Sequence, residues 1–249
     1  MTAARPEPTP GAKMQYLIQR RPTVSREALI AHWFANHMPG VIARNASARA
    51  GGRPHASRYV ASLFQPEGEG RQVWDGVAQL WYGAPLPRPA AASGVTPYDT
   101  FQQMVEPYWP WATQEWVFVD GALPLDPPTL NAPFPCTRNG FLKQVSLVPA
   151  KPGADMAAFF DHWLDVHGPN VEETMVKVGG FRYAVSLSLD LEHAPYAGMA
   201  ELYFPDRAAQ AAFWDILKPD GFQQWADEAR TLRYRCETEM VGVEAPARR

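Results

Sequence analysis

The sequence has few cysteines, no long apolar run and no strong excess of charge of either sign. Its two cysteines, Cys136 and Cys236, stand far apart among 249 residues and outside any CxxC spacing, so we expect two unpaired thiols in a cytoplasmic protein. No apolar stretch approaches the roughly 18 residues of a membrane-spanning helix, and residues 1–10 lack the apolar segment of a secretory signal. A net charge of −3 gives no reason to expect binding to nucleic acid or to an anionic membrane.

The sequence patterns of common cofactor sites are also missing. There is no glycine-rich phosphate loop, no Rossmann fingerprint and no Ser-His-Asp arrangement. Two pairs of histidines are spaced i, i+5, which differs from the i, i+4 spacing of a helical zinc site. The sequence therefore predicts a protein without a metal ion, a nucleotide or another cofactor.

Proline and aromatic residues, by contrast, are abundant. The chain has 25 prolines in 249 residues, about twice the usual share of roughly 5%. Their densest cluster falls in residues 121–139, which we predict to be a linker stiffened toward polyproline II. Residues 1–12 are predicted to be a flexible tail, extended or disordered, and residues 245–249 a second tail.

The two halves on either side of this linker are repeats of each other. Residues 13–39 align without a gap to residues 143–169, and the order of later matches is kept along both halves. Eight of these 27 positions are identical, namely Lys13, Leu17, Pro22, Ala28, His32, Trp33, His37 and Pro39. We therefore expect a tandem duplication, with a first repeat at 13–120 and a second at 140–244.

Each repeat has the residue pattern of a β-α-β-β-α-β unit. A short apolar run before a proline is typical of a strand, and a capping residue, Ser25 or Asp155, then precedes an amphipathic segment. We expect Pro39 and Pro169 to end these two helices. The predicted fold class is α+β, with two ferredoxin-like repeats whose antiparallel sheets bury their uncovered faces against each other and form an α/β barrel.

The second repeat resembles the EthD family of dimeric α/β-barrel proteins. The resemblance is carried by the turn at residues 151–153, Lys-Pro-Gly, and by the motif His-Trp-Leu-Asp-Val-His-Gly-Pro at 162–169. The first repeat departs from it at Thr23 and Met38, where the second repeat has glycine. The resemblance implies the fold but not the reaction, because the superfamily includes cyclases, decarboxylases, dehydratases, isomerases, quinone-forming monooxygenases and accessory proteins.

His37 and His167 are the candidate catalytic residues. Each is expected at the C-terminal end of a helix on its core-facing side, where an imidazole near neutral pKa can give or take a proton. The alternative is a structural histidine that bonds to the last carbonyls of its own helix. His32 and His162 lie about 140° around the helix from these residues and are expected to be half-exposed packing residues.

Three further residue types at matching positions are candidates for substrate binding. A tyrosine that opens the second strand could orient a phenol or a ketone, and the arginine before it could hold a carboxylate unless it is simply solvated. The tryptophan of the helix is a weaker candidate, because core packing explains it as well. The candidates are Tyr59 and Tyr183, Arg58 and Arg182, and Trp33 and Trp163.

These residues favour a cofactor-independent lyase or isomerase. It would cyclise, dehydrate or decarboxylate a small aromatic or polyketide-like substrate by histidine acid–base chemistry in an apolar barrel cavity. One alternative is a cofactor-free quinone-forming monooxygenase. Another is a non-catalytic ligand-binding or accessory protein whose interior is filled with aromatic side chains. The expected partner is the small-molecule substrate, and the sequence leaves open a homodimer and whether one or both repeats keep a site.

Overall fold

A computed structural model describes residues 5–65, 73–122 and 138–243, without the side chains of 138–139 and 237–243. Most of the predicted linker at 121–139, and the predicted tail at 245–249, lie outside these residues. The part of the chain expected to be an N-terminal tail is extended from residue 5. There the backbone N–H of Thr9 donates a hydrogen bond to the carbonyl oxygen of Glu115 at a distance of 2.8 Å, and Pro8 forms an antiparallel β-bridge with Trp116.

Both repeats have the element order that the sequence predicts. The first contains β1 (Ala12–Ile18), α1 (Arg26–His32), η1 (Trp33–His37), α2 (Met38–Ala50), β2 (Arg58–Leu63), β3 (Gly76–Tyr82), α3 (Thr100–Met104) and β4 (Trp111–Asp120). The second contains β5 (Arg138–Val148), α4 (Met156–His162), η3 (Trp163–His167), α5 (Gly168–Lys177), β6 (Arg182–Ser188), β7 (Gly198–Phe204), α6 (Arg207–Ile216), η4 (Phe222–Gln224) and β8 (Leu232–Val243).

The prediction that Pro39 and Pro169 end the first helix of each repeat is wrong. In both repeats an α-helix passes through a π-helical turn, η1 or η3, and continues as α2 or α5. The widened turn is closed by bonds from residue i to residue i−5, for example from the backbone N–H of Gly168 to Trp163 O. The prolines fall just after this change of register, where a missing N–H is tolerated. His37 and His167 therefore lie within π-turns, and the prediction that they lie at helix C-termini is also wrong.

Antiparallel pairs of strands build the sheet. Hydrogen bonds connect the described strands in the closed order β1-β3-β2-β8-β5-β7-β6-β4, which is that of an α/β barrel. Within the second repeat, β5 pairs with β7 and β7 with β6, so that Lys143 lies opposite Tyr203. The predicted fold class, α+β with ferredoxin-like repeats and antiparallel sheets, is confirmed.

The chain folds into two compact units, and each unit contains part of the last strand of the other repeat. The described part of one unit contains residues 5–9, 113–122 and 140–237, and that of the other contains residues 10–65, 73–112, 138–139 and 238–243. Residues 113–120 of β4 pair with β6 of the second repeat, and residues 238–243 of β8 pair with β2 of the first. The units and the sequence repeats therefore differ at their last strands.

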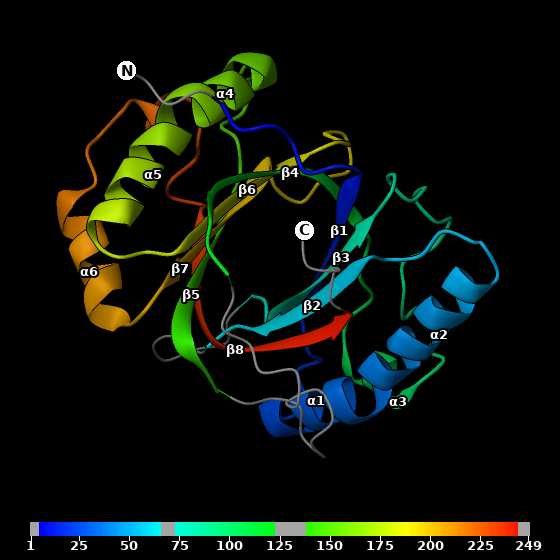
Figure 1. Ribbon diagram of the computed structural model, residues 1–249. Coiled ribbons are helices and arrows are strands. Elements are labelled where there is room, and N and C mark those ends of the chain that lie inside the picture. The colour runs from blue at the N-terminus through cyan, green and yellow to red at the C-terminus, as the bar shows by residue number, and fades with distance from the viewer. Residues whose placement is uncertain (1–4, 66–72, 123–137, 244–249) are drawn as a thin grey trace. The chain divides into compact units, whose positions relative to one another are not determined.

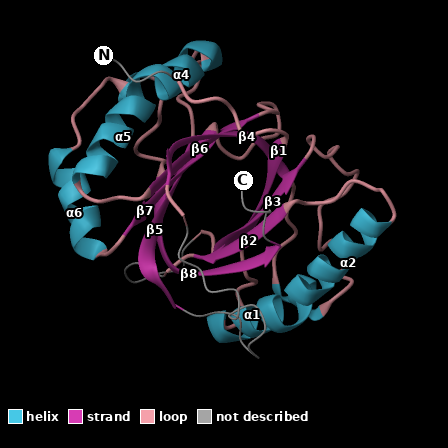
Figure 2. Cartoon of the chain, in the orientation of Figure 1, coloured by secondary structure: helices cyan, strands magenta, loops and turns pink. Residues whose placement is uncertain are grey.

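Each unit has helices on one face of its strands. In one unit α4, α5 and α6 lie over β5, β6 and β7 (Figure 1), and in the other α1 and α2 lie over β2 and β3 (Figure 2). Trp163 and Trp33 fill these layers and are 1% and 0% exposed. Because burying one large apolar side chain contributes about 1.5–3 kcal/mol, these layers supply much of the stability.

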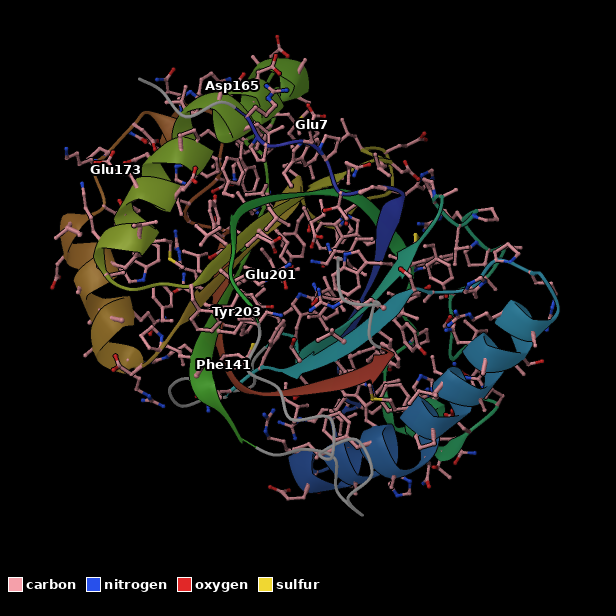
Figure 3. The ribbon with its side chains drawn as sticks, viewed as in Figure 1. Glu7, Phe141, Asp165, Glu173, Glu201 and Tyr203 are labelled. Carbon is pink, nitrogen blue, oxygen red and sulfur yellow. The ribbon has the colours of Figure 1, made fainter. Side chains whose placement is uncertain are left out.

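The opposite face of the second repeat's strands carries buried charge. Figure 3 shows Glu201 and Tyr203 on the side of β7 that points away from α5 and α6. Nζ of Lys143 lies 2.8 Å from Oε1 of Glu201, and both side chains are almost fully buried. Strand alternation therefore separates an apolar layer under the helices from a face with paired charges.

Candidate functional site

The candidate site of the second repeat is built on His167, which the π-turn η3 directs toward the loop after α6. The imidazole Nδ1 lies 2.8 Å from Oδ2 of Asp220, and the ring stacks on Phe222 with a centroid distance of 3.9 Å. An ionised carboxylate can only accept hydrogen bonds, so we assign the proton to Nδ1. When the ring is neutral, this leaves Nε2 with a lone pair for a substrate proton.

Asp220 accepts hydrogen bonds from two donors besides the histidine in the described part of the chain. Its Oδ2 accepts a hydrogen bond from Nδ2 of Asn170 at 2.7 Å, and its Oδ1 accepts one from the backbone N–H of Phe222 at 3.0 Å. Burial raises the pKa of Asp220, but the hydrogen bond and charge of His167, together with the bonds from Asn170 and Phe222, outweigh it. The pKa of Asp220 is thus held well below its ordinary value. The carboxylate remains ionised and stabilises a positive charge on His167.

A cavity of about 430 Å³ adjoins this pair. His167 and Asp220 form part of its wall, and the aromatic side chains that line it are Trp163, Tyr183, Phe213, Trp214 and Phe222. Several of these side chains belong to the core between the helices and the strands. The cavity therefore lies in the helix-covered layer, and the prediction of a cavity on the uncovered face of the sheet is wrong for this site.

Two polar groups in the cavity wall have no hydrogen-bond partner among the described residues. They are the hydroxyl of Tyr183, a residue that is 0% exposed, and the indole N–H of Trp163. Burial raises the pKa of Tyr183, and the neighbouring indole opposes this only in part. An indole N–H can only donate, so a contact between the two groups could involve only the oxygen of Tyr183 and would leave its hydroxyl proton without an acceptor. Tyr183 therefore stays protonated and available as a donor.

The position directly after His167 has no room for a side chain, which explains the glycine of the EthD-like motif, Gly168. A Cβ at this position would lie 2.2 Å from Cζ of Phe118. The ring of Phe118 in turn stacks on Tyr183 at a centroid distance of 5.2 Å. The glycine thus lets β4 approach the helix and hold the tyrosine ring in place.

The first repeat has the same histidine–aspartate arrangement. Nδ1 of His37 lies 2.7 Å from Oδ2 of Asp99, and the ring packs 4.3 Å from Phe101. Burial lowers the pKa of His37, and the hydrogen bond and charge of Asp99 offset this only in part. Asp99 also caps α3, because its side chain accepts from the backbone N–H of Gln102.

The surroundings of the two histidines differ. In the first repeat the ring of Tyr98 lies 6.0 Å from that of His37, and Arg44 donates to the Tyr98 hydroxyl at 2.7 Å. In the second repeat Pro219 precedes the aspartate, and Thr174 takes the place of Arg44 at the repeat offset of 130. The first histidine therefore faces a tyrosine and a cation that the second lacks.

One region of the chain matches a known protein family. Residues 151–230 match the EthD domain family. The second repeat contains an EthD domain. The matched residues include His167, Asp220 and Phe222, so the histidine–aspartate pair and its stacking partner all lie in the EthD domain.

Solved structures resemble the fold of the whole chain at very low sequence identity. A mutant chlorite dismutase from Candidatus Nitrospira defluvii has 7% identity and a TM-score of 0.50, with 92% of each chain covered. An anthrone oxidase-like protein has 6% identity and a TM-score of 0.49, with 96% of this chain and 95% of that chain covered. Comparison with curated protein sequences gave no match.

The predicted substrate-binding residues separate into two groups. Tyr183 and Trp163 line the cavity of the EthD domain. Arg182 is instead directed to Asp120, with Nη1 2.7 Å from Oδ1.

In the first repeat Arg58 lies over the ring of Trp81, with its Cζ 4.8 Å from the ring centroid. Tyr59 and Trp33 of that repeat are buried in its core.

His162 is a half-buried packing residue, with its ring centroid 4.5 Å from that of Trp225. Its Nε2 lies 3.7 Å from Oδ1 of Asp220 and makes no hydrogen bond within the described residues. His32 in the first repeat instead lies 2.8 Å from the hydroxyl of Thr100. Only the second repeat therefore places both motif histidines beside one carboxylate.

The two aspartates are not among the residues predicted from the sequence, although a signal for them exists. Asp99 and Asp220 both begin the pattern Asp-x-Phe-Gln-Gln, which occurs once in each repeat. Asp99 and Asp220 are 121 positions apart, whereas the histidines are 130 apart, so an ungapped alignment does not pair them. A search for the pattern in both halves would have found the partner of each histidine.

Two further observations concern cofactors and membranes. In the described ranges, no group of three or more His, Cys, Asp or Glu side chains is placed to hold a metal ion. Of the helices described, none combines the length and the apolar character needed to cross a membrane.

Proposed function

We propose that the EthD domain of the second repeat is a cofactor-independent lyase or isomerase for a small aromatic or polyketide-like molecule. The observation that carries the proposal is the His167–Asp220 pair in the wall of a cavity of about 430 Å³. This volume is in the usual range of about 300–1,000 Å³ for small-molecule sites. The cytoplasmic location and the homodimer considered from the sequence stay predictions.

The pair supports proton transfer by a simple sequence of steps. Nε2 of neutral His167 takes a proton from a carbon next to a carbonyl group, and the electrons of the broken C–H bond form an enolate. Asp220 accepts the Nδ1–H bond and stabilises the imidazolium that results. The imidazolium then returns the proton, either to a leaving hydroxyl that departs as water or to another atom of the substrate. Dehydration and isomerisation follow directly from this exchange. Cyclisation follows when the enolate carbon attacks a second carbonyl carbon of the substrate and the imidazolium protonates the alkoxide oxygen that forms.

The wall of the cavity favours an aromatic substrate. Trp163, Phe213 and Phe222 provide flat apolar surface against which a ring can stack. Phe222 also stacks on His167, which fixes the plane of the imidazole next to the bound ring. A polyketide-like phenol supplies both the ring and the acidic C–H bonds that such a base requires.

Hydrogen–deuterium exchange tests the proposal without knowledge of the natural substrate. 2-Tetralone, an aromatic ketone with exchangeable C–H bonds, is incubated with the full chain in D2O, and deuterium uptake is followed by NMR. We expect the protein to accelerate exchange and His167→Gln to reduce the acceleration by about 10²–10⁴-fold, the usual loss when a general base is removed.

His37→Gln is the matched control in the other repeat. Retained exchange in this variant places the chemistry in the second repeat, whereas loss in both single variants indicates that both repeats act. Undiminished exchange in the His167 variant, the His37 variant and the double variant would contradict histidine catalysis. That result would favour a non-catalytic binding protein.

A further inference from the structure

Tyr183 is a buried donor with an unused hydrogen bond, and the proposed proton transfer by His167 does not require it. Its hydroxyl has no partner among the described residues, although the side chain is fully buried and lines the cavity. Leaving such a group unpaired destabilises the folded protein, and about nine in ten buried polar groups in proteins are paired. A ligand that pairs with the hydroxyl would remove this cost.

The neighbouring groups determine which kind of ligand atom fits. The indole N–H of Trp163, also unpaired in the same wall, can only donate a hydrogen bond. The buried amide of Gln144 is already engaged, because its Oε1 accepts bonds from Gln210 at 2.7 Å and from Trp214 at 3.1 Å. The unused groups in this part of the wall are thus donors. They select a ligand atom with lone pairs, such as a carbonyl or phenolate oxygen.

The tyrosine is also held in a fixed orientation. Phe118 stacks on its ring, and the absence of a side chain at Gly168 permits that approach. A donor held by packing in an apolar wall loses little entropy when it binds a ligand. A hydrogen bond made there is stronger than the same bond in water.

We propose that the hydroxyl of Tyr183 binds an oxygen atom of the substrate, so that the cavity selects planar aromatic molecules with a carbonyl or phenolic oxygen over the parent hydrocarbons. This inference rests on the proposed function for the role of the oxygen. Tyr183 and His167 line the same cavity, so one bound molecule can offer its oxygen to the tyrosine and its C–H bond to the histidine. The charge that develops on the oxygen would strengthen the tyrosine bond. The binding selectivity itself does not depend on catalysis.

A binding cycle with two probes tests the selectivity. Dissociation constants of 2-tetralone and of tetralin, which has the same ring system without the carbonyl, are measured for the full chain and for Tyr183→Phe. The ratio of the tetralin constant to the tetralone constant should fall by roughly 3–10-fold in the variant, the worth of one net hydrogen bond. Tyr59→Phe, the matching change in the first repeat, should leave the ratio unchanged.

An infrared measurement on the unmodified protein keeps the test independent of how the variant folds. The carbonyl stretch of bound 2-tetralone should move to lower wavenumber than that of 2-tetralone in an apolar solvent. An unshifted stretch, an unchanged ratio in Tyr183→Phe, or no binding of 2-tetralone would overturn the proposal. His167→Gln should keep the binding ratio while it loses deuterium exchange, so a failure of Tyr183 is distinguishable from a failure of His167.

Discussion

Replacing Asp220 by Asn tests whether this carboxylate organises the site. The side chain is 11% exposed and accepts from Nδ1 of His167, from Asn170 and from the backbone of Phe222. An amide of the same shape has only one acceptor oxygen. In either orientation its NH2 group must therefore face a donor that the carboxylate had satisfied.

The size of the effect follows from these contacts. A hydrogen bond to a charged group contributes about 1.5–3 kcal/mol, and the partial exposure of the pair reduces this contribution. Loss of at least one such bond, together with the charge, should lower the free energy of unfolding by about 2–3 kcal/mol at pH 7. Urea denaturation followed by fluorescence measures it.

The pH dependence gives a second, independent readout. The pKa of Asp220 is lowered in the folded protein, so its ionised form contributes stability above the unfolded pKa of about 4, and this contribution is lost as the pH falls toward the lower folded pKa. A protonated carboxyl group, like the amide, offers a single good acceptor. The difference between the wild type and Asp220→Asn should therefore shrink as the pH drops below about 4.

Asp206→Asn is the control for this change. Asp206 also precedes a helix and accepts a backbone N–H, from Ala209 at 2.8 Å, but it is exposed and has no histidine partner among the described residues. Asn caps helices about as well as Asp, so we expect a loss below about 0.5 kcal/mol. Equal losses for both variants at pH 7 would refute the idea that Asp220 has a special role.

Two further predictions concern packing and pH. Gly168→Ala should destabilise the protein by about 1–3 kcal/mol because its Cβ meets the ring of Phe118, and the smaller side chain of Phe118→Leu should recover part of the loss in the double variant in thermal melts. An unchanged melting temperature for Gly168→Ala would show that the ring of Phe118 does not exclude a Cβ at residue 168. The pKa of His37 is lowered on folding, so the stability due to its neutral form is complete above about pH 6.5 and is lost as the pH falls through the lower folded pKa. The unfolding free energy of His37→Gln should therefore decline less steeply below pH 6.5 than that of the wild type. An equal decline with pH in both proteins would contradict a lowered pKa of His37 in the folded protein.

The repeat and its elements could be predicted because they depend on local patterns. Identical residues at a constant offset show the duplication, and capping residues such as Ser25 and Asp155 mark the first helices as the structure has them. His167 could be selected from its motif and its helical spacing. Each of these inferences needs only neighbouring residues, whose geometry is set by the period of the helix or strand.

The features that could not be predicted depend on hydrogen-bond register and on distant contacts. A helix that shifts to i−5 bonds before Pro169 has the same residue pattern as one that stops there. The exchange of the last strands depends on which strand β4 pairs with. The side chains of β4 would alternate between the two faces in the same way beside either repeat, so the sequence pattern does not indicate its partner. The bond between His167 and Asp220 joins residues 53 positions apart, and only the folded chain shows it directly.

The duplication gives an internal comparison that argues for a division of roles between the repeats. Both keep the histidine, its aspartate and a phenylalanine ring packed on the histidine, so this set of contacts is compatible with a purely structural use. What differs is the surroundings. Asn170 adds a donor to Asp220, whereas the first repeat has glycine at the matching position, residue 40. His37 instead has Arg44 and the ring of Tyr98 near it, and the cation and burial both favour its neutral form. A base must accept a proton and hold the resulting charge. The second repeat, whose carboxylate accepts hydrogen bonds from His167, Asn170 and the backbone of Phe222 and adjoins a cavity, meets that requirement better than the first.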